Sequence, residues 1–201
     1  MMRHVIAVFV FGTFAFLVFG AVAQAIPPQA KLSDLLGLEG DWRGELAYLD
    51  YGTGERAEIG MAASVSATPD DGFIVTRARY TDPGFDVFIM GLMTIDEQTG
   101  ALVESYHRGN DIEKFVYSMK SVEWTPAGWI YVFEDEGRDD GRPALIRRTF
   151  SLENDVYTQR KDVDFLDDDR SEYIFRNETV LRRTDEPVTF DDFRKRDLQQ
   201  Q

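Results

Sequence analysis

Short runs of alternating apolar and polar residues fill most of the chain between residues 41 and 183. In one of these runs, Phe115, Tyr117 and Met119 share a face and their polar neighbours occupy the other. A period of two is typical of β-strands with one buried face. The pattern therefore predicts an all-β domain.

Each run ends at a cluster of Gly, Asn, Asp or Pro, the residues that favour tight turns. A longer acidic turn, exposed to solvent, is predicted at Glu136–Gly141. The ten predicted strands are Asp41–Tyr51, Arg56–Ala67, Phe73–Thr81, Asp86–Ile95, Ala101–Arg108, Ile112–Trp124, Trp129–Asp135, Pro143–Leu152, Val156–Val163 and Arg170–Arg183.

The short connections determine how these strands pair. No segment between Asp41 and Arg183 is long and periodic enough for the crossover helix that parallel strands need, so the sheet is predicted to be an antiparallel up-and-down meander. A ten-stranded meander leaves exposed edges unless it closes into a barrel. A two-sheet sandwich is the alternative architecture.

The N-terminal segment, residues 1–25, has the features of a secretory signal peptide. Arg3 and His4 form a positive head, an apolar run follows, and Ala23-Gln24-Ala25 is a small-x-small cleavage signal. We therefore expect an exported protein, in the bacterial periplasm or outside the cell, with no stable membrane insertion after cleavage. An uncleaved membrane anchor is the alternative, because the apolar run is long for a signal peptide.

Two further segments flank the predicted barrel of residues 41–183. The lead-in, residues 26–40, carries leucines at helical spacing, and a short helix is predicted at Lys31–Leu38. The tail, residues 184–201, contains a candidate helix that begins at Thr189 and runs through Asp192.

Composition excludes several classes of function. The formal net charge of −14 disfavours nucleic acids and anionic membrane surfaces as partners. The chain has no Cys, which removes disulfides, thiolate nucleophiles and Cys-based metal sites. It also has no Gly-x-Ser-x-Gly and no Gly-rich phosphate loop, so the sequence assigns no catalytic residue.

Gly40-Asp41-Trp42 opens the first predicted strand, and Arg182 and Arg183 end the last one. This plan resembles the lipocalin and fatty-acid-binding superfamily, the calycins, and a group of uncharacterised exported bacterial proteins with lipocalin-like barrels. The resemblance implies that Trp42 closes one end of the barrel and that Arg182 or Arg183 packs on its indole. The Arg-x-Tyr pair that holds a carboxylate in intracellular fatty-acid binders is missing from Arg170–Arg183.

A barrel of this kind predicts a small apolar or amphipathic ligand in its interior. Arg148 shares its parity with Ile146 and Phe150, so it points inward, toward a carboxylate, water or an anionic head group, unless it lies outside and pairs with surface carboxylates. The candidate ligand-binding residues are Tyr117, Met119, Tyr131, Arg148 and Tyr173.

No cofactor is predicted. His107 is the one His after residue 25; it could hold a haem or act as a general base, but its place beside a turn favours a plain surface role. Asp167–Asp169 is a weak candidate for calcium, because the segment does not fit the EF-hand pattern.

Three functions remain open at this point. The first is a binding protein, the second is a hydrolase or isomerase that uses Tyr, Asp or His107 at the barrel mouth, and the third is a barrel filled by its own side chains. The size of the internal cavity discriminates between the first and the third.

Overall fold

A computed structural model of the chain describes residues 29–82 and 85–190. The predicted signal peptide and the second half of the candidate C-terminal helix, residues 191–192, lie outside these residues, and residues 185–190 contain no helix. The elements are α1 (Leu32–Leu35), the 3-10 helix η1 (Leu36–Leu38), β1 (Gly40–Leu49), β2 (Arg56–Ala67), β3 (Ile74–Asp82), β4 (Phe85–Ile95), β5 (Leu102–Arg108), β6 (Asp111–Thr125), β7 (Gly128–Asp139), β8 (Arg142–Glu153), β9 (Val156–Phe165) and β10 (Ile174–Thr184).

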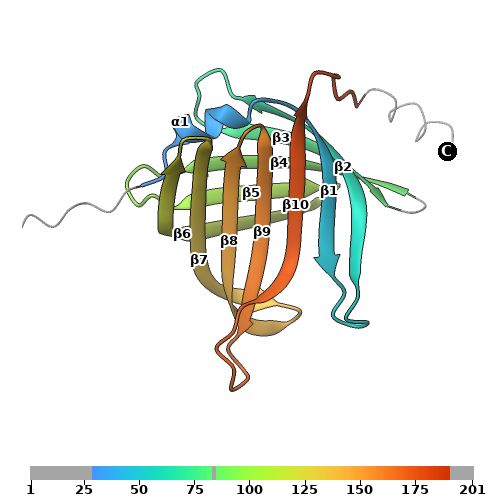
Figure 1. The fold of residues 1–201 in the computed structure, drawn as a ribbon, viewed down its shortest axis with the longest axis vertical. Coiled ribbons are helices and arrows are strands. Elements are labelled where there is room, and N and C mark those ends of the chain that lie inside the picture. Colours follow the sequence, from blue (N-terminus) through green and yellow to red (C-terminus); the bar gives the residue numbers. More distant parts are fainter. Residues whose placement is uncertain (1–28, 83–84, 191–201) are drawn as a thin grey trace, which may run out of the picture.

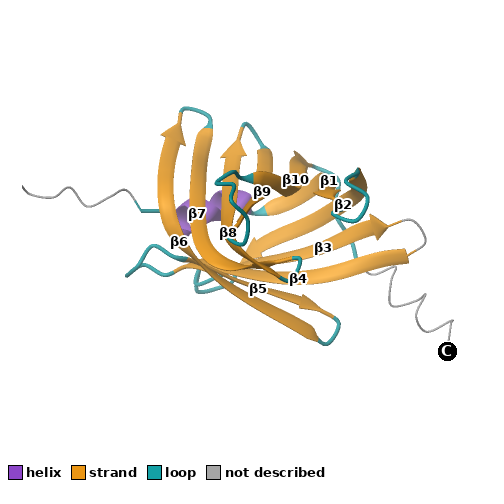
Figure 2. Ribbon diagram, turned by 90° about the horizontal axis from the view of Figure 1, so that it is seen from below, coloured by secondary structure: helices purple, strands orange, loops and turns teal. Residues whose placement is uncertain are grey.

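The ten strands form an antiparallel meander in which each strand pairs with the next, and β10 pairs with β1 to close a barrel (Figure 1). This confirms the predicted fold class. Figure 2 shows the strands curving around an interior, with the short helical segment at one end of it. Among the described residues, no helix has the length and apolar character needed to cross a membrane.

The helical segment α1–η1 plugs one end of the barrel. Leu35 and Leu38 are buried in the core. The Tyr131 hydroxyl donates a hydrogen bond to Asp34 Oδ2 at 2.6 Å, and Trp129 Nε1 donates to the Asp34 carbonyl at 3.2 Å. The plug is therefore held by apolar burial and by two hydrogen bonds from β7.

The start of β1 is fixed against this plug. Trp42 is 1% exposed, and its Nε1 donates to the Leu38 carbonyl at 2.8 Å. The Arg183 guanidinium lies 4.4 Å from the centre of the Trp42 ring and donates to the Gly37 carbonyl at 2.7 Å. Arg182, the neighbouring residue, is exposed on the outer face.

The predicted acidic turn at Glu136–Gly141 is wrong. β7 continues to Asp139, paired with Arg142 of β8, and the turn consists of Asp140 and Gly141 alone. Both turn residues have positive φ, 48° and 73°, which suits a two-residue hairpin. The strand continues because Asp139 is buried and ion-paired inside the barrel and is not solvated.

Candidate functional site

A cavity of about 50 Å³ lies inside the barrel, beneath Trp42. It has room for roughly four water molecules. Most of the cavity wall is apolar and a smaller part of it is polar. The apolar part includes Leu38, Trp42, Met61, Ala63, Ala78, Ile89, Met93 and Leu181, and Thr76, Tyr80 and Thr179 lie among these residues.

The polar side of the cavity is centred on Glu104 of β5, which is 1% exposed. The Tyr106 hydroxyl donates to Glu104 Oε1 at 3.0 Å, and Gln159 Nε2 donates to the Tyr106 hydroxyl at 3.2 Å. Tyr157, from β9, lies between this chain of hydrogen bonds and the indole of Trp42, with the two ring centres 6.2 Å apart.

Arg148 of β8 is not among the residues that line the cavity, but it lies close enough to Glu104 to influence the pKa of that carboxyl. Its side chain points inward with Ile146 and Phe150, and its guanidinium carbon lies 5.4 Å from the centre of the Tyr117 ring. In the described part of the chain, no nitrogen of Arg148 comes within 4.0 Å of a Glu104 oxygen. Buried Glu104 and partly buried Arg148 are close enough to influence each other's titration, but they form no ion pair.

Three atoms of this cluster are buried without a hydrogen-bond partner among the described residues: Glu104 Oε2, Arg148 Nε and the Tyr157 hydroxyl. A buried polar atom without a partner costs about 1–3 kcal/mol. Two of these atoms, Glu104 Oε2 and the Tyr157 hydroxyl, belong to residues that line the cavity, so water or a ligand there is the natural source of the missing bonds.

Burial also shifts the protonation equilibria of the cluster. It raises the pKa of Glu104, although Arg148 and the Tyr106 hydroxyl oppose this shift. Burial likewise raises the pKa of Tyr106 and that of Tyr157 well above the ordinary value. The guanidinium of Arg148 stays charged, because Tyr117, Glu104 and Tyr106 raise its pKa by more than burial lowers it.

A second buried charged group lies further along the barrel. The ammonium of Lys161 contacts Asp139 Oδ1, and Arg176 Nε lies 3.2 Å from Asp139 Oδ2. Arg176 also stacks on Tyr51, with 4.2 Å between its guanidinium carbon and the ring centre. Asp139 is therefore paired with two cations. Burial lowers the pKa of Lys161, and Arg148 and Arg176 lower it further, whereas Asp139 opposes this shift.

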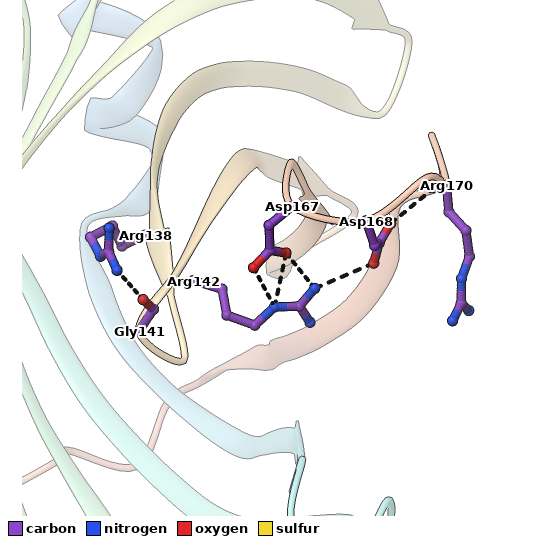
Figure 3. Close-up of polar contacts among 6 residues, drawn as sticks. All are labelled: Arg138, Gly141, Arg142, Asp167, Asp168 and Arg170. Carbon is purple, nitrogen blue, oxygen red and sulfur yellow. Dashed lines mark hydrogen bonds and ion pairs between the residues drawn. The ribbon is translucent and has the colours of Figure 1, made fainter.

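A polar recess lies at the end of the barrel opposite to Trp42. Figure 3 shows the polar contacts of Arg142 at this end. There Arg142 binds both carboxylate oxygens of Asp167 and reaches Asp168 Oδ2 at 3.4 Å. Its guanidinium also covers Phe165, 3.8 Å from the ring centre. The carboxylates of Asp167 and Asp168 are therefore hydrogen-bonded to Arg142. The described residues contain no cluster of His, Cys, Asp or Glu suited to a metal.

The other predicted ligand-binding residues lie in different surroundings. Tyr117 is buried under Arg148, and Met119 is half-buried against the core. Tyr131 is fully buried, with its hydroxyl used by the plug. Tyr173 lies on the outer face, where its hydroxyl donates to Glu134 Oε2 at 2.7 Å.

His107 lies away from the cavity. Its parity on β5 is opposite to that of Glu104 and Tyr106, and its Nε2 is 3.4 Å from the Ser105 hydroxyl. His107 is not among the residues that line the cavity.

Sequence reasoning missed Glu104, Tyr106, Tyr157 and Gln159. The available signal was parity: Glu104 alternates with Val103 and Ser105, on the same face as Leu102. A single acidic residue on an apolar face is weak evidence by itself, because its partners come from distant strands.

Comparison with known proteins supports the fold. No family model matches the chain, and no curated protein matches it. Among solved structures, the crystal structure of Rv2717c from M. tuberculosis matches with a TM-score of 0.54 and 12% sequence identity, over 78% of this chain and 99% of that one. The chain is thus a closed ten-stranded antiparallel β-barrel that fits a lipocalin-like fold.

Proposed function

We propose that this protein binds a small amphipathic molecule inside its barrel. The ligand's apolar body lies against Trp42, Met61 and Ala78, and its polar head meets Glu104 and Tyr157. One observation carries the proposal: Glu104 and Tyr157, each with a buried polar atom that has no hydrogen-bond partner among the described residues, line a cavity whose other walls are mostly apolar. Small-molecule sites usually combine these two features.

We also propose a protein family and a cellular location for this chain. The Gly40-Asp41-Trp42 opening and the stacked Arg183 support membership of the calycins, and residues 1–25 support export to the periplasm or the medium. A small-molecule partner and an exported location are both consistent with an acidic chain that contains no Cys.

The experiment is titration calorimetry with two probes small enough for a cavity of about 50 Å³, 1-propanol and sodium acetate. We expect at least one of them to bind the unmodified protein. Ala78→Leu, which fills the cavity from the wall, lowers the affinity at least tenfold. Ala127→Leu adds the same atoms in an exposed turn and leaves binding unchanged.

Two results would contradict the proposal. One is that neither probe gives a measurable heat of binding. The other is equal binding by Ala78→Leu and the parent, which would place the probe elsewhere. Both would favour a barrel whose interior is filled by its own side chains and bound water.

A further inference from the structure

We propose that the polar head of the ligand is a neutral hydroxyl, which donates to Glu104 Oε2 and accepts from the Tyr157 hydroxyl. This inference rests on the proposed function and specifies its ligand class as a small alcohol. It concerns the two cavity-lining residues that each have a buried polar atom without a hydrogen-bond partner among the described residues.

Glu104 and Tyr157 reach the cavity from different strands. Glu104 lies on β5 and is 1% exposed, and Tyr157 lies on β9. Both line the same cavity of about 50 Å³, which holds a head group of only a few atoms. Glu104 is also close enough to Tyr157 to raise the pKa of its hydroxyl beyond the effect of burial. One small head group is therefore within reach of both residues.

The hydrogen bonds within the protein leave one bond to be made at each residue. Glu104 Oε1 accepts from the Tyr106 hydroxyl at 3.0 Å, whereas Oε2 has no donor among the described residues. Arg148 and the Tyr106 hydroxyl favour the ionised form of Glu104 against the effect of burial, and an ionised carboxylate can only accept. The Tyr157 hydroxyl has a proton to donate. The site thus offers one acceptor and one donor to a ligand.

A hydroxyl is a small group that satisfies both residues at once, since it carries one donor and two acceptor lone pairs. Its proton goes to Glu104 Oε2, and its oxygen accepts the proton of Tyr157. It also reproduces the hydrogen bonds that water makes to such groups. An alcohol therefore enters the cavity without leaving either buried atom unpaired.

A charged head group does not suit this wall. The described residues that line the cavity include no Lys, Arg or His, so a carboxylate head would meet no cation there and would lie beside Glu104. An ammonium head has no lone pair with which to accept from Tyr157. It would also add a second cation near a carboxyl whose titration Arg148 already influences. A neutral head avoids both costs.

The volume of the cavity limits the rest of the ligand. About 50 Å³ admits a few carbon atoms beside the hydroxyl, and the apolar wall around Trp42, Met61 and Ala78 suits an aliphatic body. The ligand class is therefore a short aliphatic alcohol.

The test compares four probes of one shape by calorimetric titration of the unmodified protein, at a mildly alkaline pH that favours ionised Glu104. 2-Propanol, acetone, sodium acetate and isopropylammonium chloride share one branched skeleton, so they differ in hydrogen bonding and charge and hardly in size. We expect 2-propanol to bind at least tenfold more tightly than each of the other three. Acetone is the decisive comparison, because it can accept from Tyr157 but has no proton for Glu104.

Two substitutions assign the two hydrogen bonds. Glu104→Gln places an amide nitrogen, which donates, where a carboxylate oxygen accepts, so the preference for 2-propanol over acetone should fall below about threefold. Tyr157→Phe removes the donor and keeps the ring that packs against Trp42, and it should weaken 2-propanol binding at least fivefold. Glu123→Gln, an exposed control, should bind all four probes as the parent does. The comparison of probes uses the unmodified protein, so it tests the inference even if a variant does not fold.

The outcomes separate the two proposals. If acetone, acetate or isopropylammonium binds as tightly as 2-propanol, the hydroxyl inference is overturned and the binding function stands. If Glu104→Gln keeps the full preference for 2-propanol, another group accepts the proton of the alcohol and the inference is again overturned. If no probe binds, 1-propanol included, both proposals fall.

Discussion

At the scale of single residues, Arg183 links the last strand to the helical plug. It covers the indole of Trp42 and donates to the Gly37 carbonyl and to Asp155 Oδ1. A lysine cannot make these bonds together, because the planar guanidinium supplies several donors in a fixed geometry.

Arg183→Lys should therefore lower the free energy of unfolding by about 1–3 kcal/mol. Arg182→Lys is the matched control, since Arg182 is exposed, and it should leave stability within about 0.5 kcal/mol of the parent. Urea denaturation followed by tryptophan fluorescence measures both variants. Equal effects of the two substitutions would refute the role assigned to Arg183.

Glu134 is the residue whose charge most clearly supports the folded state. It accepts hydrogen bonds from Lys120 at 2.9 Å, Tyr173 at 2.7 Å and Arg147 at 2.9 Å. Burial raises the pKa of Glu134, but these three donors outweigh it and lower the pKa to about 2.

The folded-state pKa is thus below the unfolded one, so the stabilisation is present above the unfolded pKa and is lost as the pH falls toward about 2. Glu134→Gln should cost about 1–3 kcal/mol at neutral pH and almost nothing near pH ~2. Glu136→Gln, exposed on the same strand, serves as the control. Urea titrations at several pH values test this, and a pH-independent cost would contradict it.

The residues of the site were only partly predictable. Alternation on the eighth strand placed Arg148 on the face of Ile146 and Phe150, and the structure shows that orientation. Glu104 and Tyr157 could not be found in this way, because their importance depends on β5 and β9 meeting across the interior. These two strands meet only when the barrel closes, and the alternation within a single strand does not predict that contact.

At the scale of elements, the contact between β1 and β10 decides whether the sheet closes. Gly44, paired with Leu181, allows the two strands to approach closely: a Cβ built at Gly44 would lie 1.9 Å from the Val180 carbonyl oxygen. A residue with a side chain at this position must push the strands apart.

Gly44→Ala should consequently destabilise the barrel by roughly 2–4 kcal/mol. Gly60→Ala is the matched control on the neighbouring strand, since a Cβ at Gly60 would meet no atom within 4 Å. Urea midpoints and the near-ultraviolet circular dichroism of the buried aromatics report the effect. A Gly44→Ala protein as stable as Gly60→Ala would argue against tight closure at this seam.

Most of the strands could be predicted from the sequence, because the alternation of apolar and polar residues and the turn residues are local signals. The β7–β8 hairpin was the exception. Its acidic composition indicated a solvated turn, yet Asp139 is buried because β9 and β10 supply Lys161 and Arg176. Such compensation between distant strands is invisible in the segment itself.

At the scale of the whole molecule, a strongly acidic chain encloses a cluster of cations. The formal net charge is −14, whereas Arg148, Lys161 and Arg176 lie inside or at the inner surface of the barrel. Two of these cations, Lys161 and Arg176, are paired with the buried carboxylate of Asp139, so a large part of the interior charge is balanced by the protein itself. Closure of the sheet and a filled core replace the disulfides that the chain lacks.

The most direct test of a ligand-binding barrel is native mass spectrometry of the protein purified without denaturation from its own source. We predict a mass above that of the polypeptide, with the excess lost on denaturation and recovered as a small amphipathic molecule. A mass equal to the bare polypeptide in both conditions, with no uptake of 1-propanol or acetate on addition, would contradict the account.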